Sequence, residues 1–214
     1  MIKEMTSEQL IEKGYLALNS DTWYVKGCIG APLDYDLERW TEASRYSYNR
    51  LNAKSIRKHA EDAVKAGTHC FGGDCICFWK AIFWGWNADG TKEYGGCTYQ
   101  KDGILDETIN YYRTNYCEDV STDFSNILPG EALFLDKDGS HFGVYVGDGY
   151  AIEITPKWTG NMQKTQVWNI NKTEDKGRKW WAHGKLKFID YKQPKYKKII
   201  CPCCGKEIGT FLEV

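Results

Sequence analysis

The sequence predicts an α+β fold in which N-terminal helices pack on a central antiparallel sheet. In the first half of the chain, apolar and small residues recur at helical spacing, and residues 75–86 are almost wholly apolar. From Pro129 onward, apolar residues alternate with polar ones, which is typical of strands with one buried face. Helices followed by a run of strands, without an internal repeat, favour this fold class.

The helical half begins at residues 6–19, where Thr6 and Gln9 stand at capping-box spacing. Residues 52–66 are expected to form a polar helix that Gly67 ends. The other elements expected here are an extended piece (21–25), a loop (27–32), a loop with partial helix (34–50), a tight loop (71–74) and two helices (75–86 and 106–115).

The second half is predicted to contain five strands followed by a separate tail. The expected strands are 132–136, 142–147, 151–155, 165–170 and 181–189. Residues 1–189 would then form one domain, 190–198 a Lys-rich linker and 199–214 a short Cys-rich tail.

The composition argues against several classes of function. The 28 basic and 29 acidic side chains nearly cancel, so no net field draws the chain to nucleic acid or to an anionic membrane. No stretch approaches the roughly 18 apolar residues that span a bilayer, and the polar N-terminus lacks the apolar core of a secretory signal peptide. We therefore expect a protein made in the cytoplasm, where cysteines stay reduced. Nine cysteines cannot all pair, which leaves at least one free thiol.

Cys75 is distinguished from the other cysteines by its position. Asp74 is a natural N-cap residue, which places Cys75 in the first turn of the apolar helix. The helix dipole and the unpaired N–H groups at that end favour a thiolate, the form that attacks a carbonyl carbon. Cys77 lies about 200° further round the helix and off the same face. The alternative for Cys75 is inert packing, the usual role of a buried cysteine.

His141 and Glu153 could complete a catalytic group, because a thiol nucleophile needs a base and a third polar residue that orients the base. His141 opens one predicted strand, and Glu153 lies in the next. Pairing the apolar residues of the two strands requires an odd-length turn at residues 147–149, which puts Glu153 on the face of His141. The alternatives are a satisfied sheet histidine and a solvated strand carboxylate. The histidines that lack this setting are His59, His69 and His183.

Four segments, in this order, resemble the NlpC-type papain-like cell-wall cysteine peptidases (the NlpC and p-sixty superfamily). They are Tyr24 and Val25 before a Gly-rich loop, residues 71–75, residues 128–134, and the hairpin from His141 to Glu153. The resemblance spans residues 21–189 and looks closest to lysins of phages of Gram-positive bacteria. It implies a papain-like fold with Cys75 at a helix N-terminus as nucleophile, His141 as base and Glu153 as the orienting residue.

The same resemblance implies what surrounds the nucleophile and what it acts on. Tyr24, Asp74 and Ser140 are the expected oxyanion and substrate-binding residues, and the backbone N–H of Cys75 would be a further oxyanion donor. Peptidoglycan is the expected partner, and catalysis needs no cofactor. Such an enzyme is stored in the producing cell and acts on the wall after release. Two departures concern substrate selection: Ile76 stands where such relatives have Ser, and the segment 26–73 is longer than usual.

Four functions stay open at this point. The first is a stem-peptide endopeptidase of the endolysin type, and the second is an N-acetylmuramoyl-L-alanine amidase on the same scaffold. The third is a papain-like acyltransferase, which passes the acyl group to an amine or alcohol instead of water. The fourth is a non-catalytic wall-binding or zinc-ribbon interaction module.

Two cysteines of the tail, Cys201 and Cys204, stand at the spacing of one zinc knuckle. Two thiolates fill only half of a tetrahedral structural site, so a zinc ion here would need ligands from a second chain. The tail is therefore a candidate homodimer contact, and the alternative is a free or oxidised tail.

Overall fold

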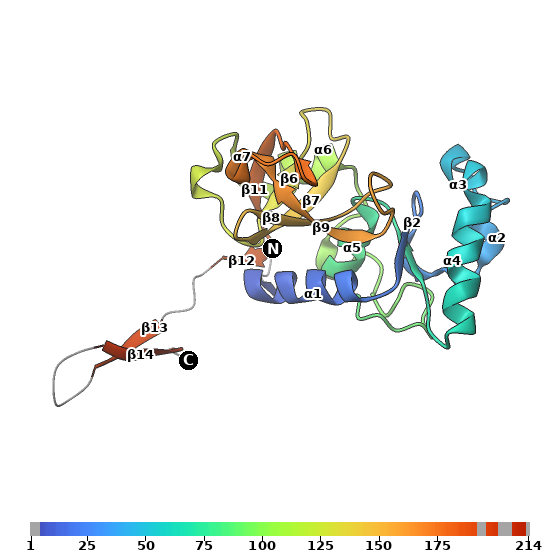
Figure 1. Ribbon diagram of the computed structural model, residues 1–214, viewed down its shortest axis with the longest axis horizontal. Helices are drawn as coiled ribbons and strands as arrows, with labels where there is room; N and C mark the ends of the chain where they lie inside the picture. The colour runs from blue at the N-terminus through green and yellow to red at the C-terminus, as the bar shows by residue number, and fades with distance from the viewer. Residues whose placement is uncertain (1–4, 192–195, 201–206, 213–214) are drawn as a thin grey trace.

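The computed structural model describes residues 5–191, 196–200 and 207–212, with side chains up to Tyr191. Its centre is a seven-stranded sheet in the order β10-β9-β8-β7-β6-β11-β5, with helices beside it (Figure 1). The predicted α+β class is confirmed. The strands are β5 (Cys117–Ser121), β6 (Ala132–Phe134), β7 (Phe142–Gly147), β8 (Tyr150–Ile154), β9 (Met162–Val167), β10 (Gly177–Arg178) and β11 (Ala182–Leu186).

The sheet is mixed and not purely antiparallel as predicted. Five of its pairings are antiparallel, but β10 runs parallel to β9, with Gly177 opposite Gln166. The short helix α7 (Trp168–Asn171) lies between these two strands in the chain. It carries the chain back so that β10 starts from the same end as β9, which a tight hairpin turn could not do.

One face of the sheet packs on α1 (Ser7–Asn19) and α5 (Cys77–Phe83), and together they form the main hydrophobic core. The predicted capping box is present at the start of α1. Gly14 allows α1 to approach closely, since a Cβ there would stand 3.0 Å from the ring of Trp79. The close packing of α1 therefore fixes α5 against the strands that carry the candidate site.

The opposite face of the sheet carries a smaller apolar cluster that includes Leu133, Tyr145 and Trp180. Buried polar side chains lie on the same face, because they occupy the alternate positions of the strands. They are His141, Glu153, Thr165 and His183.

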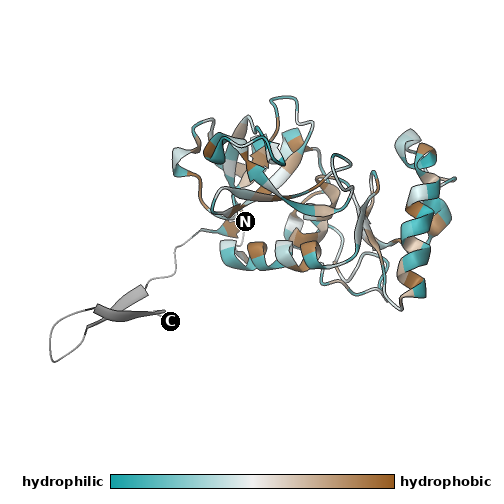
Figure 2. Cartoon of the chain, viewed as in Figure 1, coloured by the Kyte–Doolittle hydropathy of each residue, from teal (hydrophilic) through white to brown (hydrophobic). Residues whose placement is uncertain are grey.

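Residues 26–73 build a lobe with a core of its own, drawn in cyan at the right of Figure 1. The elements of this region are β2 (Thr22–Tyr24), β3 (Ile29–Pro32), the 3₁₀ turn Leu33–Tyr35, α2 (Leu37–Trp40), α3 (Ser47–Leu51), α4 (Ala53–Lys65) and β4 (Phe71–Gly73). The predicted polar helix is α4, whose alternating brown and teal sides in Figure 2 show one apolar face. That face buries Ile56, Ala60 and Ala63.

Three local predictions were wrong in type or length. The expected tight loop at 71–74 is mostly strand β4, which pairs with β2 and β3. The apolar helix begins at Cys77 instead of 75 and ends at Phe83 instead of 86, and Gly85 follows with a φ of 96°. The expected helix 106–115 is α6 (Ile109–Tyr111), capped by Thr108 and continued by a π-helical turn, Tyr112–Tyr116.

The C-terminal region begins with β12 (Ile189–Asp190), which pairs with β1 (Met5–Thr6). A hairpin of β13 (Tyr196–Ile200) and β14 (Glu207–Leu212) follows. Within the predicted linker 190–198, Asp190 belongs to β12 and residues 196–198 belong to β13. Cys201 and Cys204 lie outside the described residues. Among the described helices, none is long and apolar enough to cross a membrane.

Candidate active site

Glu153 is fully buried on β8 and accepts hydrogen bonds at both oxygens. His141 contacts Oε2 through Nε2 at 2.6 Å, and the Thr165 hydroxyl donates to Oε1 at 2.6 Å. Arg178 reaches both oxygens, with Nε 2.8 Å from Oε1 and Nη2 2.8 Å from Oε2. Burial raises the pKa of Glu153, but the bond from His141 and the charge of Arg178 outweigh it, so the net pKa is lowered. Glu153 is thus a carboxylate.

Strand register brings Glu153 to His141, as the apolar pattern predicted. Val144 pairs with Ile152, so the residues before and after them share faces. The turn itself differs from the prediction: Asp148 and Gly149 form a two-residue turn with φ of 53° and 76°. A bulge between Tyr145 and Gly147 supplies the odd residue.

The ring of His141 is held on two sides. It is 7% exposed and stacks on Trp180, with ring centroids 5.7 Å apart. Because a carboxylate only accepts hydrogen bonds, the contact with Glu153 places the proton on Nε2. In the neutral form of the ring, Nδ1 then has the lone pair that a general base needs.

Cys75 lies at the entrance of α5, next to the strand of His141. The backbone of Phe142, the residue after His141, acts to lower the pKa of the Cys75 thiol, and both residues are buried in the main core. Burial and the charge of Asp74 raise the pKa of Cys75 to about 12, and this outweighs the backbone hydrogen bonds that lower it. The expectation that the helix start favours a thiolate is therefore wrong for the resting site. A Cys75 thiol with a raised pKa is neutral near pH 7.

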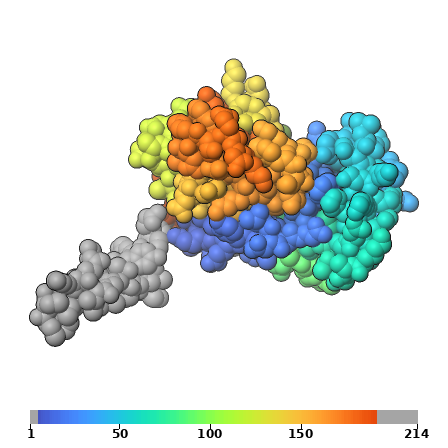
Figure 3. Space-filling model, in the orientation of Figure 1, coloured from blue at the N-terminus to red at the C-terminus, as the bar shows by residue number. Residues whose placement is uncertain are grey.

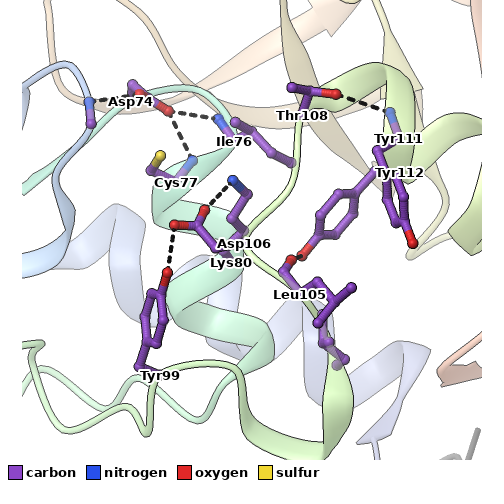
Figure 4. A network of polar contacts seen from close by, with 12 residues as sticks. Asp74, Ile76, Cys77, Lys80, Tyr99, Leu105, Asp106, Thr108, Tyr111 and Tyr112 are labelled. Atoms are coloured by element: carbon purple, nitrogen blue, oxygen red, sulfur yellow. Dashed lines mark hydrogen bonds and ion pairs between the residues drawn. The ribbon is translucent and has the colours of Figure 1, made fainter.

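Asp74 binds the start of α5 with its side chain, but the helix begins at Cys77 with Ile76 as its N-cap, so Cys75 lies just before the first turn and not in it as predicted. Its Oδ1 accepts the backbone N–H groups of Ile76 and Cys77, at 3.2 Å and 2.8 Å (Figure 4). Its Oδ2 accepts the N–H of Gly27 at 2.8 Å. The carboxylate that fixes the helix start also places a negative charge beside the Cys75 thiol, which explains the missing thiolate.

Tyr24 stands close enough to Cys75 for their charges to interact. Burial, and then the charges of Cys75 and Asp74, raise the pKa of Tyr24, so its hydroxyl stays protonated and can donate. Tyr48 of α3 packs edge-on against it, with centroids 5.2 Å apart. The N–H of Tyr24 donates to the carbonyl of Gly160 at 2.7 Å. Tyr24 therefore lies where the sheet meets the lobe of residues 26–73, and the surface is notched along this boundary (Figure 3).

Ser140 is an exposed loop residue whose hydroxyl binds the carboxylate of Asp136. Its backbone N–H also donates to Asp136, at 3.1 Å. These contacts shape the loop that leads into β7. The structure therefore gives Ser140 a local partner, and its role in substrate binding stays a prediction.

Sequence reasoning missed Thr165 of β9, the strand next to Glu153, and Arg178 of β10, one strand further, which both hold Glu153. It also set aside His183, which lies in a second buried pair: Nδ1 contacts Glu131, and Nε2 is 2.8 Å from the carbonyl of Asp123. Both partners accept, so both ring nitrogens donate and the ring is an imidazolium. Burial lowers the pKa of His183, but the hydrogen bonds to Glu131 and Asp123 outweigh it, and the net pKa is raised. In the sequence, the only indication of these contacts was the polar residues at alternate positions of the strands.

Comparisons of this chain with protein-family models, with curated proteins and with solved structures gave no match. Any functional conclusion therefore rests on the residues and their geometry.

Proposed function

We propose that this chain is a thiol hydrolase that cleaves an amide bond of the peptidoglycan stem peptide, as an endolysin does. One observation carries the proposal: the buried carboxylate of Glu153 binds Nε2 of a buried His141, and Cys75 is buried in the same core as Phe142, the residue after His141. A histidine that only fills the core does not need a cysteine and a carboxylate beside it, whereas thiol catalysis requires a nucleophile, a base and a group that orients the base. The resemblance to NlpC-type peptidases in the order of these residues adds to the proposal.

The reaction follows from the protonation states. The Cys75 sulfur attacks the amide carbon while its proton passes to Nδ1 of His141, since the thiol is neutral at rest. Glu153 stabilises the imidazolium that forms. The hydroxyl of Tyr24 and the backbone N–H of Cys75 are the proposed donors to the oxyanion. His141 then gives its proton to the leaving amine, and a water, deprotonated by His141, releases the acyl group as a carboxylic acid.

The proposal includes the setting in which the enzyme works. The enzyme would wait in the producing cell and reach its wall substrate at lysis. No nucleic acid, membrane or cofactor takes part in the proposed reaction.

A second candidate is the amidase that cuts between the glycan's lactyl group and the first alanine. The contacts of Asp74 favour it, because both oxygens already accept backbone N–H groups. A substrate ammonium group would have to share those oxygens. The acyltransferase alternative uses the same groups and differs only in the acceptor.

Digestion of purified cell walls, with mass analysis of the products, tests the proposal. Shortened stems still attached to sugar indicate the endopeptidase, and free stems that begin with alanine indicate the amidase. Acyl groups transferred to an added amine, without hydrolysis, would replace the hydrolase by the acyltransferase.

The matched variants are Cys75→Ala and Cys77→Ala, which remove equally buried thiols, each 8% exposed, from neighbouring positions. Cys75→Ala and His141→Ala should each abolish cleavage, because the two act as a unit. Cys77→Ala should retain it. Full activity in folded Cys75→Ala would end the assignment.

A further inference from the structure

The lobe of residues 26–73 contains a hollow of about 300 Å³ that the catalytic residues do not use. Its wall combines a glycine, two aromatic rings and two guanidinium groups. The residues are Gly27, Arg39, Trp40, Ser44, Arg45 and Tyr46.

The hollow is tied rigidly to the nucleophile. Gly27 donates its N–H to Asp74, the residue before Cys75. Asn49, which is 0% exposed, binds both the N–H and the carbonyl of Lys26, at 2.9 Å and 3.0 Å. These contacts leave little freedom between the hollow and the nucleophile.

The start of α3 connects the hollow with the candidate site. Tyr46, directly before the helix, lies against Gly27, where a Cβ would stand 2.2 Å from the Tyr46 ring. Tyr48, in the helix, packs on Tyr24 beside the nucleophile. A residue that lines the hollow and a residue that contacts Tyr24 are therefore only two positions apart in the chain.

Positive charge gathers in the hollow and is only partly neutralised. Arg45 stacks on Tyr46 at 4.8 Å and donates to its hydroxyl at 2.7 Å, and Lys26 lies 5.9 Å from the same ring. Arg39 pairs with Glu93 at 3.3 Å. Within the part of the chain that has described side chains, no carboxylate pairs with Arg45. The nearby Glu42 pairs with Arg57 instead.

We propose that this hollow binds a free carboxylate of the stem peptide, with Arg45 as the group that recognises it. The inference rests on the proposed function and names the part of the substrate that the lobe selects. A planar guanidinium matches a carboxylate with two parallel hydrogen bonds. Stacking on Tyr46 already orders Arg45, so less side-chain entropy is lost when the ligand binds.

The experiment compares two synthetic stem peptides that differ only at the C-terminus, one a free acid and the other an amide. The wild type should cleave the acid with a kcat/KM about fivefold higher, a value at the upper end for an ion pair that solvent reaches. In Arg45→Gln this ratio should fall to near one. Lys58→Gln removes an exposed cation of α4 that pairs with Asp62 outside the hollow, and should keep the wild-type ratio.

Equal cleavage of acid and amide by the wild type would overturn the proposal. So would an Arg45→Gln protein that keeps the wild-type ratio. If the wild type cleaves neither peptide, the proposed hydrolase function is wrong. The role of the hollow is then tested separately, by measuring the binding of the two peptides. The Cys75→Ala protein should then bind the acid more tightly than the amide, measured by tryptophan fluorescence, and equal affinities would overturn the hollow as a carboxylate site.

Discussion

The contact between Arg178 and Glu153 leads to the most demanding test of the site. Arg178→Gln removes the hydrogen bond from Nε and the ion-pair contact from Nη2 that the guanidinium makes to Glu153, each 2.8 Å long. The carboxylate then stays in the sheet with only His141 and Thr165 as donors. Removing one partner of a buried ion pair costs about 3–5 kcal/mol of the free energy of unfolding. In a chain of 214 residues, that lowers Tm by about 6–20 °C.

The same variant should change the response to acid. Because the folded-state pKa of Glu153 is lowered, its contribution to stability is present above the ordinary value of 4.5 and is lost as the pH falls through the folded-state pKa. Without Arg178 that pKa rises, so acid unfolding should begin at a higher pH. Turnover should fall about tenfold or more, since a carboxylate that shifts by 1 Å misplaces the base.

Thermal unfolding followed by circular dichroism across the acid range, with turnover measured on the same samples, checks both effects. Arg178→Lys keeps the positive charge but loses the planar guanidinium that contacts both oxygens of Glu153. Its losses of Tm and turnover should therefore be intermediate. Lys185→Gln, which breaks a more exposed pair with Asp119, is the control and should change the unfolding free energy by no more than about 1 kcal/mol. An Arg178→Gln protein with wild-type Tm and acid midpoint would refute the reasoning.

Three other predictions follow from the described contacts and from the tail. Glu153→Gln should lower turnover substantially without abolishing it, because Cys75 and the oxyanion donors remain; a wild-type rate would contradict the orienting role. His183 has a raised pKa, so its contribution to stability is complete below about pH 6.5 and is lost as the pH rises through the folded-state value. His183→Gln should therefore flatten the decline of Tm above that pH, and an unchanged decline would show that another group causes it. Deleting the residues after Asp190 should yield an active monomer, whereas the full chain should hold about one zinc per two chains by elemental analysis; one zinc per monomer would exclude the shared site.

Local chemistry in the sequence determined several features that the structure bears out. The capping box at Thr6 and Gln9 depends only on residues three apart, so it could be read directly. The bounds of β7 follow from alternation and a terminal glycine. The shared face of His141 and Glu153 follows from parity, because a side-chain period of two leaves one choice once the apolar residues are paired.

Only the tertiary structure decided what surrounds Glu153. Arg178 and Thr165 reach it from strands whose order in the sheet no local pattern records, and β10 arrives parallel through a crossover. Residues 71–73 have no strand alternation, and they become β4 because β2 and β3 supply its hydrogen bonds.

The state of the Cys75 thiol shows the same division. Its place at a helix start could be predicted from Asp74, but whether it ionises could not. A helix start favours a thiolate through a local dipole, whereas burial and the capping carboxylate act on the same sulfur in the opposite direction, and here they are stronger. Sequence specifies local geometry, while the ionisation of a buried group depends on every charge and every solvent boundary that the fold brings near it.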